Sequence, residues 1–272
     1  GVVSDSTQID YDNGVSVVSS NRGLQGEGVA PALLTITQSN PYDYGARAIG
    51  STTPFTFDVT NTGDFPATAV NESLLAPPFT FAGGVFPGTG GTCTTTIATG
   101  ATCSIVVAFA PTSLGLATGS IQLNYNNGAT AQISVRTLQG TGVSPAVIAI
   151  SDAPSYNFGL QPIGSTSLHT FTLTNTGGAP ATALSGSGLA SPYDFAGGTF
   201  PGTLGTCTGT LAPAASCTIV VSYQPLAAGV VNDTLDINFN DGAVAQISSR
   251  NIAGTGAVPA IITISNANPY NY

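Results

Sequence analysis

Residues 197–225 have the sequence GGTFPGTLGTCTGTLAPAASCTIVVSYQP, and residues 83–111 have the similar sequence GGVFPGTGGTCTTTIATGATCSIVVAFAP. The two stretches align without insertion or deletion, because both cysteines of the earlier stretch recur 114 positions later (207 − 93 = 114 and 217 − 103 = 114). Self-similarity at a fixed period is typical of repeat proteins. The sequence therefore predicts a tandem repeat with a period of 114 residues.

The same period extends to both ends of the chain. Residues 1–30 match 115–144 and 229–258, and residues 259–272 match 31–44. A period of this size fits one β-sandwich of about 100 residues per repeat. The predicted segments are the C-terminal hairpin of a preceding repeat (1–30), two full repeats (31–144 and 145–258) and the first strand of a following repeat (259–272).

The composition excludes several classes of partner. The net charge is −9, with 13 acidic residues, four arginines and no lysine, and no basic cluster is available to neutralise phosphates. We therefore expect no nucleic-acid partner. No apolar run approaches the roughly 20 residues of a membrane helix, so we expect no membrane insertion by this segment.

All four cysteines fall in two C-x9-C pairs, Cys93 with Cys103 and Cys207 with Cys217. A zinc site would need closer spacing and further cysteine or histidine ligands, so the pairs favour two local disulfides over metal sites. Disulfides persist in oxidising compartments. The sequence therefore predicts a protein outside the cytosol, with no metal or other cofactor.

Apolar residues alternate with smaller or polar residues through each repeat, as in Cys103/Ile105/Val107/Phe109 and Ile121/Leu123/Tyr125. A period of two with β-branched and aromatic residues predicts half-buried strands packed on a second sheet. Asn13-Gly14, Asn127-Gly128 and Asp241-Gly242 each lie between two such runs and predict a hairpin that closes every repeat. The alternation breaks after this turn, which predicts a β-bulge near Arg136 and Arg250.

Three short segments join the repeats: 28–31, 142–145 and 256–259, each ending in proline. Proline restricts itself and the residue before it, so adjacent domains should hold a limited range of orientations. The predicted fold class is therefore all-β, with tandem sandwich domains arranged as an elongated rod.

A set of motifs recurs in the second repeat: Phe158-Gly159, IGST at 163–166, FTLTNTG at 171–177, the cysteine segment and a closing Gly-Thr-Gly at 254–256. Taken together, they resemble the Ig-like domains of the ASH/Hydin type and the bacterial "choice-of-anchor D" repeats of large secreted or surface proteins. The first repeat departs slightly, with Tyr44 in place of Phe158. The resemblance implies Ig-like sandwiches of seven to nine strands in a modular extracellular protein. It implies no common catalytic activity or ligand.

Catalytic and metal-binding residues should recur in each repeat, and the candidates do not. His169 is the only histidine, and its counterpart is Phe55. No acidic residue of the first full repeat aligns with an acidic residue of the second, which leaves no recurring carboxylate pair. The Asp/Asn-rich turns at 10–14, 124–128 and 238–242 suggest calcium loops, but the middle copy has no acid. We therefore predict that the chain is not an enzyme.

Arg22, Arg136 and Arg250 are the only charged residues that recur in all three copies. We expect each to donate hydrogen bonds to backbone carbonyls. The alternative is a basic ladder for phosphate or sulfate groups. The Gly- and Pro-containing loop around Phe86 and Phe200 is the best candidate for a contact surface, but the favoured interpretation is an internal cap on the core. If the two phenylalanines are exposed instead, they mark an interface between modules or chains.

The leading functional hypothesis is a non-enzymatic structural segment of an extracellular or cell-surface stalk, fibre or filament, in a bacterial protein. Its partners would be neighbouring repeats and other copies of the chain, and unpaired edges at both ends suggest assembly by strand exchange. The alternative is an adhesin module that binds glycan or a host protein through its loops.

Overall fold

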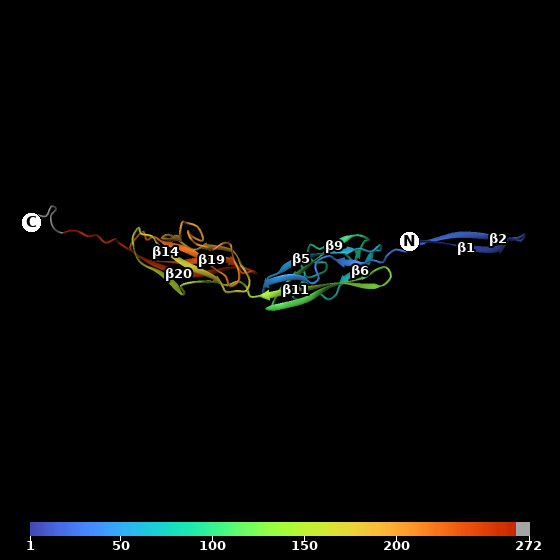
Figure 1. The fold of residues 1–272 in the computed structure, drawn as a ribbon, viewed down its shortest axis with the longest axis horizontal. Coiled ribbons are helices and arrows are strands. Elements are labelled where there is room, and N and C mark those ends of the chain that lie inside the picture. Colours follow the sequence, from blue (N-terminus) through green and yellow to red (C-terminus); the bar gives the residue numbers. More distant parts are fainter. Residues whose placement is uncertain (265–272) are drawn as a thin grey trace, which may run out of the picture. The chain divides into compact units, whose positions relative to one another are not determined.

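The computed structural model describes residues 1–264, and its regular elements are all strands (Figure 1). The all-β prediction is therefore confirmed. The chain divides into two compact units. Most of the first full repeat lies in one unit and most of the second in the other.

The first full repeat consists of two sheets. The four-stranded sheet has the order β3-β5-β9-β7, with β3 Leu34–Ile36, β5 Thr53–Asn61, β9 Thr102–Phe109 and β7 Phe79–Phe81. The five-stranded sheet has the order β4-β11-β10-β6-β8, with β4 Tyr42–Ala48, β11 Ala131–Val143, β10 Gly115–Asn126, β6 Ala67–Glu72 and β8 Thr96–Ile97.

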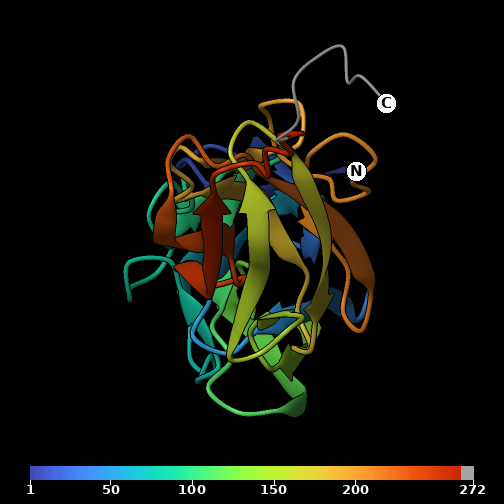
Figure 2. The ribbon, with the colours of Figure 1, turned by 90° about the vertical axis from the view of Figure 1, so that its left-hand side faces the viewer.

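The second full repeat has the same strand order. Its four-stranded sheet is β12-β14-β18-β16, with β12 Ile148–Ile150, β14 Ser167–Asn175, β18 Ser216–Tyr223 and β16 Tyr193–Phe195. Its five-stranded sheet is β13-β20-β19-β15-β17, with β13 Ser155–Pro162, β20 Ala245–Ala257, β19 Gly229–Asn240, β15 Ala181–Ser187 and β17 Thr210–Leu211. β13 and β20 are parallel neighbours, and their arrowheads point the same way in Figure 2 (yellow-green and red).

The inward side chains of both sheets form one apolar core in each repeat. Phe57, Ile105 and Leu123 are fully buried in the first repeat. Aromatic rings pair at equivalent places, with ring centroids 5.0 Å apart for Phe79 and Phe109 in the first repeat. Burying one such side chain contributes about 1.5–3 kcal/mol. The alternation in the sequence therefore predicts the core because it follows the period of the strands.

A glycine-containing turn closes the last hairpin of each repeat. In the second repeat the turn covers the four residues between Asn240 and Ala245, and Gly242 has a φ of 99°. The buried Asp241 carboxylate accepts the N–H groups of Ala243 and Val244, both at 2.8 Å. Burial raises the pKa of Asp241, but these backbone hydrogen bonds outweigh it and hold the pKa below its ordinary value.

The predicted β-bulge near Arg250 is wrong, and the one near Arg136 stays a prediction. The β19–β20 register runs without a shift from Gly229↔Gly256 to Asn240↔Ala245. The inward positions before Ile252 are occupied by polar residues, Arg250 among them, whereas Ile247 lies on the outer face and is 63% exposed. β11 has the same burial pattern. The alternation of apolar residues therefore breaks without a break in the strand.

The two terminal segments differ from the full repeats. β1 (Val2–Asp12) and β2 (Val17–Glu27) pair as an isolated antiparallel hairpin, and nearly all of its residues are exposed. Residues 259–264 form no strand. The remainder of the strand predicted at 259–272 lies outside the described residues.

Candidate functional site

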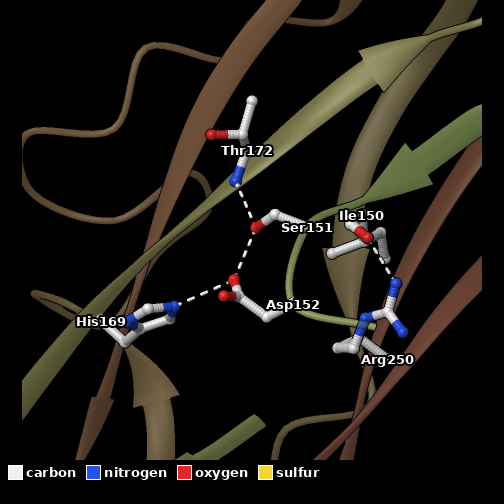
Figure 3. Close-up of polar contacts among 6 residues, drawn as sticks. All are labelled: Ile150, Ser151, Asp152, His169, Thr172 and Arg250. Carbon is white, nitrogen blue, oxygen red and sulfur yellow. Dashed lines mark hydrogen bonds and ion pairs between the residues drawn. The ribbon is translucent and has the colours of Figure 1, made fainter. Parts of the chain in front are cut away.

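Arg250 joins the first and last strands of the second repeat. Its guanidinium donates a hydrogen bond to the backbone carbonyl of Ile150, the last residue of β12 (Figure 3). Two residues earlier on β20, the Ser248 hydroxyl donates to the carbonyl of Ile148 at 2.7 Å. β12 pairs with β14 along its other edge, so these carbonyls face β20. The two side chains therefore fasten β12, from one sheet, to β20, from the other.

The other two recurring arginines lie in different surroundings. Arg136 on β11 donates to the carbonyl of Ile36, the last residue of β3, which repeats the arrangement of Arg250. Arg22 lies on the exposed hairpin. In both full repeats, the arginine thus makes the backbone hydrogen bond expected from its recurrence. In the second repeat, it does so from a strand with no bulge at Arg250.

The loop before each pair of cysteines covers the free edge of a central strand. In the second repeat, Ala196 N–H donates to Val220 O at 2.9 Å, and Val220 N–H donates to Pro201 O at 2.8 Å. Cys207 N–H donates to Thr218 O at 3.1 Å. Unpaired strand edges invite pairing with other chains. The loop therefore occupies the edge of β18 that β16 leaves uncovered.

Two disulfides fasten these loops. Cys93 is bonded to Cys103, with 4.8 Å between the two Cα atoms, and Cys207 is bonded to Cys217 with 4.9 Å. In each case, the second cysteine belongs to the strand that the loop covers. The disulfides indicate an oxidising environment. Within the described residues, no helix has the length and apolarity needed to cross a membrane.

The loop has the same shape in both repeats, and this shape depends on a glycine and an aromatic ring. A Cβ atom at Gly202 would lie 2.2 Å from the Val220 carbonyl oxygen, and the φ of Gly202 is 88°. Phe200 is half-buried and packs edge-to-face on Phe195, with ring centroids 5.6 Å apart. Phe86 in the first repeat has the same environment. These contacts favour the cap interpretation, and an interface role for Phe86 and Phe200 stays a prediction.

His169 belongs to a small polar cluster at the start of β14 (Figure 3). Its Nε2 lies 3.1 Å from Oδ2 of Asp152. The same carboxylate oxygen accepts the Ser151 hydroxyl at 2.6 Å, and Ser151 Oγ accepts the Thr172 N–H at 3.0 Å. The hydrogen bond from Ser151, followed by that from His169, holds the pKa of Asp152 below its ordinary value.

This cluster has the residues of a hydrolase triad but not its connectivity. In a triad, the serine hydroxyl donates to the imidazole, which removes the proton as the serine attacks. Here the hydroxyl of Ser151 donates to Asp152, so the histidine has no serine proton to remove. The His169 ring stacks on Tyr156, with centroids 3.6 Å apart, much as Phe55 stacks on Tyr42 at 4.1 Å. The histidine therefore occupies an aromatic position of the fold.

One residue that the sequence motifs contained but did not single out organises the turns of each repeat. Asn175 is fully buried, and its side-chain amide donates to the carbonyls of Ala179 and Leu211 at 2.9 and 3.1 Å. Its carbonyl oxygen accepts the N–H of Val147 at 3.2 Å. Asn61 makes equivalent bonds in the first repeat. The signal was present, since both residues lie in a recurring Asn-Thr-Gly sequence.

Comparison with family models identifies the type of domain. The family model for the HYDIN/CFA65/VesB-like, Ig-like domain matches residues 35–140 and 150–252. A search of curated proteins finds no match. Among solved structures, a protein of unknown function from Porphyromonas gingivalis W83 is 12% identical, with a TM-score of 0.33 over 84% of this chain and 98% of that chain.

Two further solved structures match one repeat's length of the chain. The VesB protease of Vibrio cholerae is 17% identical, with a TM-score of 0.33 over 40% of this chain and 31% of that chain. The ASH/PapD-like domain 7 of human CEP192 is 17% identical, with a TM-score of 0.33 over 43% of this chain and 89% of that chain.

Proposed function

Because the chain belongs to the HYDIN/CFA65/VesB-like Ig-like domain family, we propose that it is a non-enzymatic, load-bearing segment of an extracellular tandem-repeat protein, such as a stalk or surface fibre. The observation that carries the proposal is the attachment of the first strands of the second repeat to its last strand. Two kinds of contact make this attachment.

The first contact is the parallel pairing of β13 with β20, from Ser155↔Asn251 to Pro162↔Ala257. The chain enters the repeat before β12 and leaves it after β20. Once β12 yields, tension along the chain pulls β13 at its start and β20 at its end, in opposite directions along parallel strands. The pairing has two stretches separated by a register shift between Asn157 and Leu160. Within each stretch, parallel hydrogen bonds are evenly spaced, so the force loads them together and does not open them one by one.

The second contact is the pair of side-chain bonds from Ser248 and Arg250 to β12. β12 lies next to the point where force is applied. Only three of its residues pair with β14, so few backbone hydrogen bonds hold it in the sheet. A hydrogen bond from a charged group contributes about 1.5–3 kcal/mol, more than a neutral one. Arg250 therefore reinforces the strand that tension reaches first.

The isolated hairpin supports an array that includes further repeats. Ile9 and Leu24 are 63% and 50% exposed, whereas the residues 114 positions later, Leu123 and Leu138, are 0% and 1% exposed. In an array, strands of another repeat of this type would cover the apolar face of the hairpin. Short proline-containing linkers would limit the orientations of adjacent repeats, as in a rod.

Single-molecule force spectroscopy of the full chain tests the proposal by comparing two attachments in the second repeat. Attachment at Pro145 and Ala257 loads the parallel strands. Attachment at Gly229 and Gly256, which are paired at the open end of the β19–β20 hairpin, separates pairs one after another. We expect at least a twofold higher rupture force for the first attachment. Equal forces, or a lower force for the first, would contradict a load-bearing role.

A further inference from the structure

Each full repeat has a groove at the same place on the outer face of its five-stranded sheet. The groove has a volume of about 440 Å³ in the first repeat and about 660 Å³ in the second, within the ordinary range for small-molecule and cofactor sites. Seven positions line it in both repeats: 69, 124, 125, 126, 131, 132 and 133 in the first, and 183, 238, 239, 240, 245, 246 and 247 in the second.

The groove is the most similar part of this face when the two repeats are compared. Six of its seven shared positions hold the same residue in both repeats, and the seventh is Tyr125 in one and Phe239 in the other. A second hollow of about 570 Å³ lies on the same sheet, lined by residues 155, 232–234 and 251–253. None of these seven residues is identical to its counterpart 114 positions earlier.

The residues that are identical in the two grooves include exposed side chains, which makes their identity informative. Ile133 and Ile247 are 57% and 63% exposed. Substitutions at exposed positions usually change stability little, so the fold alone does not require isoleucine at both. By contrast, the exposed residues of the other hollow differ freely between the repeats.

A strained alanine forms part of the groove in both repeats. Ala69 and Ala183 have φ values of 52° and 53°, a conformation that the Cβ atom disfavours. Ala183 lies where the β15–β19 register shifts, between Thr182 and Ser185. Glycine would adopt this conformation without strain. Both repeats nevertheless keep a methyl group there, and such strain often marks functional sites.

The chemistry of the groove selects an uncharged, hydroxyl-rich ligand. Its shared polar groups are the amides of an asparagine pair and a glutamine. Part of their capacity is used within the chain, since Oδ1 of Asn126 and Asn240 accepts a backbone N–H and Nε2 of Gln132 and Gln246 donates to Thr130 and Asp241. The Nδ2 atoms of these two asparagines and the glutamine Oε1 atoms supply the donors and acceptors for a ligand. Alanine and isoleucine side chains supply apolar surface, and none of these lining residues is charged. A net charge of −9 also disfavours anionic polymers. We propose that each full repeat binds a neutral polysaccharide in this groove.

Affinity electrophoresis of the full chain in gels that contain dextran, mannan or laminarin tests the proposal, with alginate and dextran sulfate as anionic polymers. We expect at least one neutral polymer to retard the chain. The double variant Ile133→Asp/Ile247→Asp should bind that polymer at least tenfold more weakly. The matched control is Leu116→Asp/Val230→Asp, which adds the same charge at exposed positions of the same sheets outside the groove.

Three results would overturn the proposal: no retardation by any neutral polymer, retardation by the anionic polymers alone, or equal weakening in both double variants. A further variant separates binding from folding. Ala69→Gly/Ala183→Gly relieves the strained backbone, so its unfolding temperature should not fall, while its retardation by the neutral polymer should weaken at least twofold. Unchanged retardation would contradict the role assigned to the two methyl groups.

Discussion

Replacing Cys207 and Cys217 with alanine tests how far the loop that covers β18 depends on its covalent link. The disulfide closes a loop with a sequence separation of 10 residues. On the chain-entropy estimate, opening a loop of this size costs about 2.7 kcal/mol of stability at 25 °C. With a urea dependence of about 1–3 kcal/mol per molar for a small domain, the unfolding midpoint of the second repeat should fall by about 1–3 M.

The assay is urea unfolding followed by pulsed hydrogen exchange and mass spectrometry, which reports the two repeats through separate peptides. The first repeat retains the disulfide between Cys93 and Cys103, so it serves as the internal control and its midpoint should not change. A change of less than about 0.5 kcal/mol in the second repeat would refute the reasoning. It would mean that the backbone hydrogen bonds of the loop hold it on β18 without the disulfide.

Three further predictions concern side chains of the second repeat. Arg250→Met should destabilise that repeat by about 1.5–3 kcal/mol in the same assay, because it removes a charged hydrogen bond to β12. The control is Arg22→Met at an exposed position, which should change stability by less than about 0.5 kcal/mol. The pKa of Asp241 is lower in the folded state than its ordinary value, so its contribution to stability is present above about pH 4 and is lost as the pH falls through the folded pKa. Acid titration monitored by circular dichroism should therefore show that Asp241→Asn abolishes this loss of stability. The variant makes the second repeat resemble the first, where Asn127 occupies the position. An unchanged acid transition would contradict this prediction. His169→Phe should leave the free energy of unfolding of the second repeat within about 0.5 kcal/mol of the wild type, and a larger fall would show that the contact with Asp152 stabilises the fold.

The sequence predicted the class and the core because both follow from periodicity. Ile121 and Leu123 lie at alternate positions of β10, a strand with one buried face, and this pattern is visible without a structure. β9 also carries the pattern, but its last five residues are buried on both faces, which the alternation does not indicate. The disulfides were predictable from the recurrence of the C-x9-C pair. Their consequence was not, because the hydrogen bonds that hold the loop on β18 involve backbone atoms that no residue pattern identifies.

The candidate site was only partly predictable. The recurrence of Arg136 and Arg250 indicated a structural role, but the alternation of apolar residues suggested a bulge near Arg250 that does not exist. Ile247 follows the strand pattern of a buried residue and yet lies on the outer face, whereas the polar Ser248 lies inward. A hydrophobicity pattern assigns the inward face to apolar residues, so it fails where inward polar side chains bind an edge strand of the opposite sheet.

The most direct test of the load-bearing account is end-to-end extension of the native chain before and after reduction of the disulfides. The account predicts two high-force unfolding events, one for each full repeat. Reduction should lengthen each event by about 31 Å, since 10 residue steps of roughly 3.6 Å each replace the 4.8–4.9 Å between the two bonded cysteines. The peak force should remain, because the disulfide does not join β13 to β20. Loss of the high-force events on reduction, or their absence from the native chain, would contradict the account.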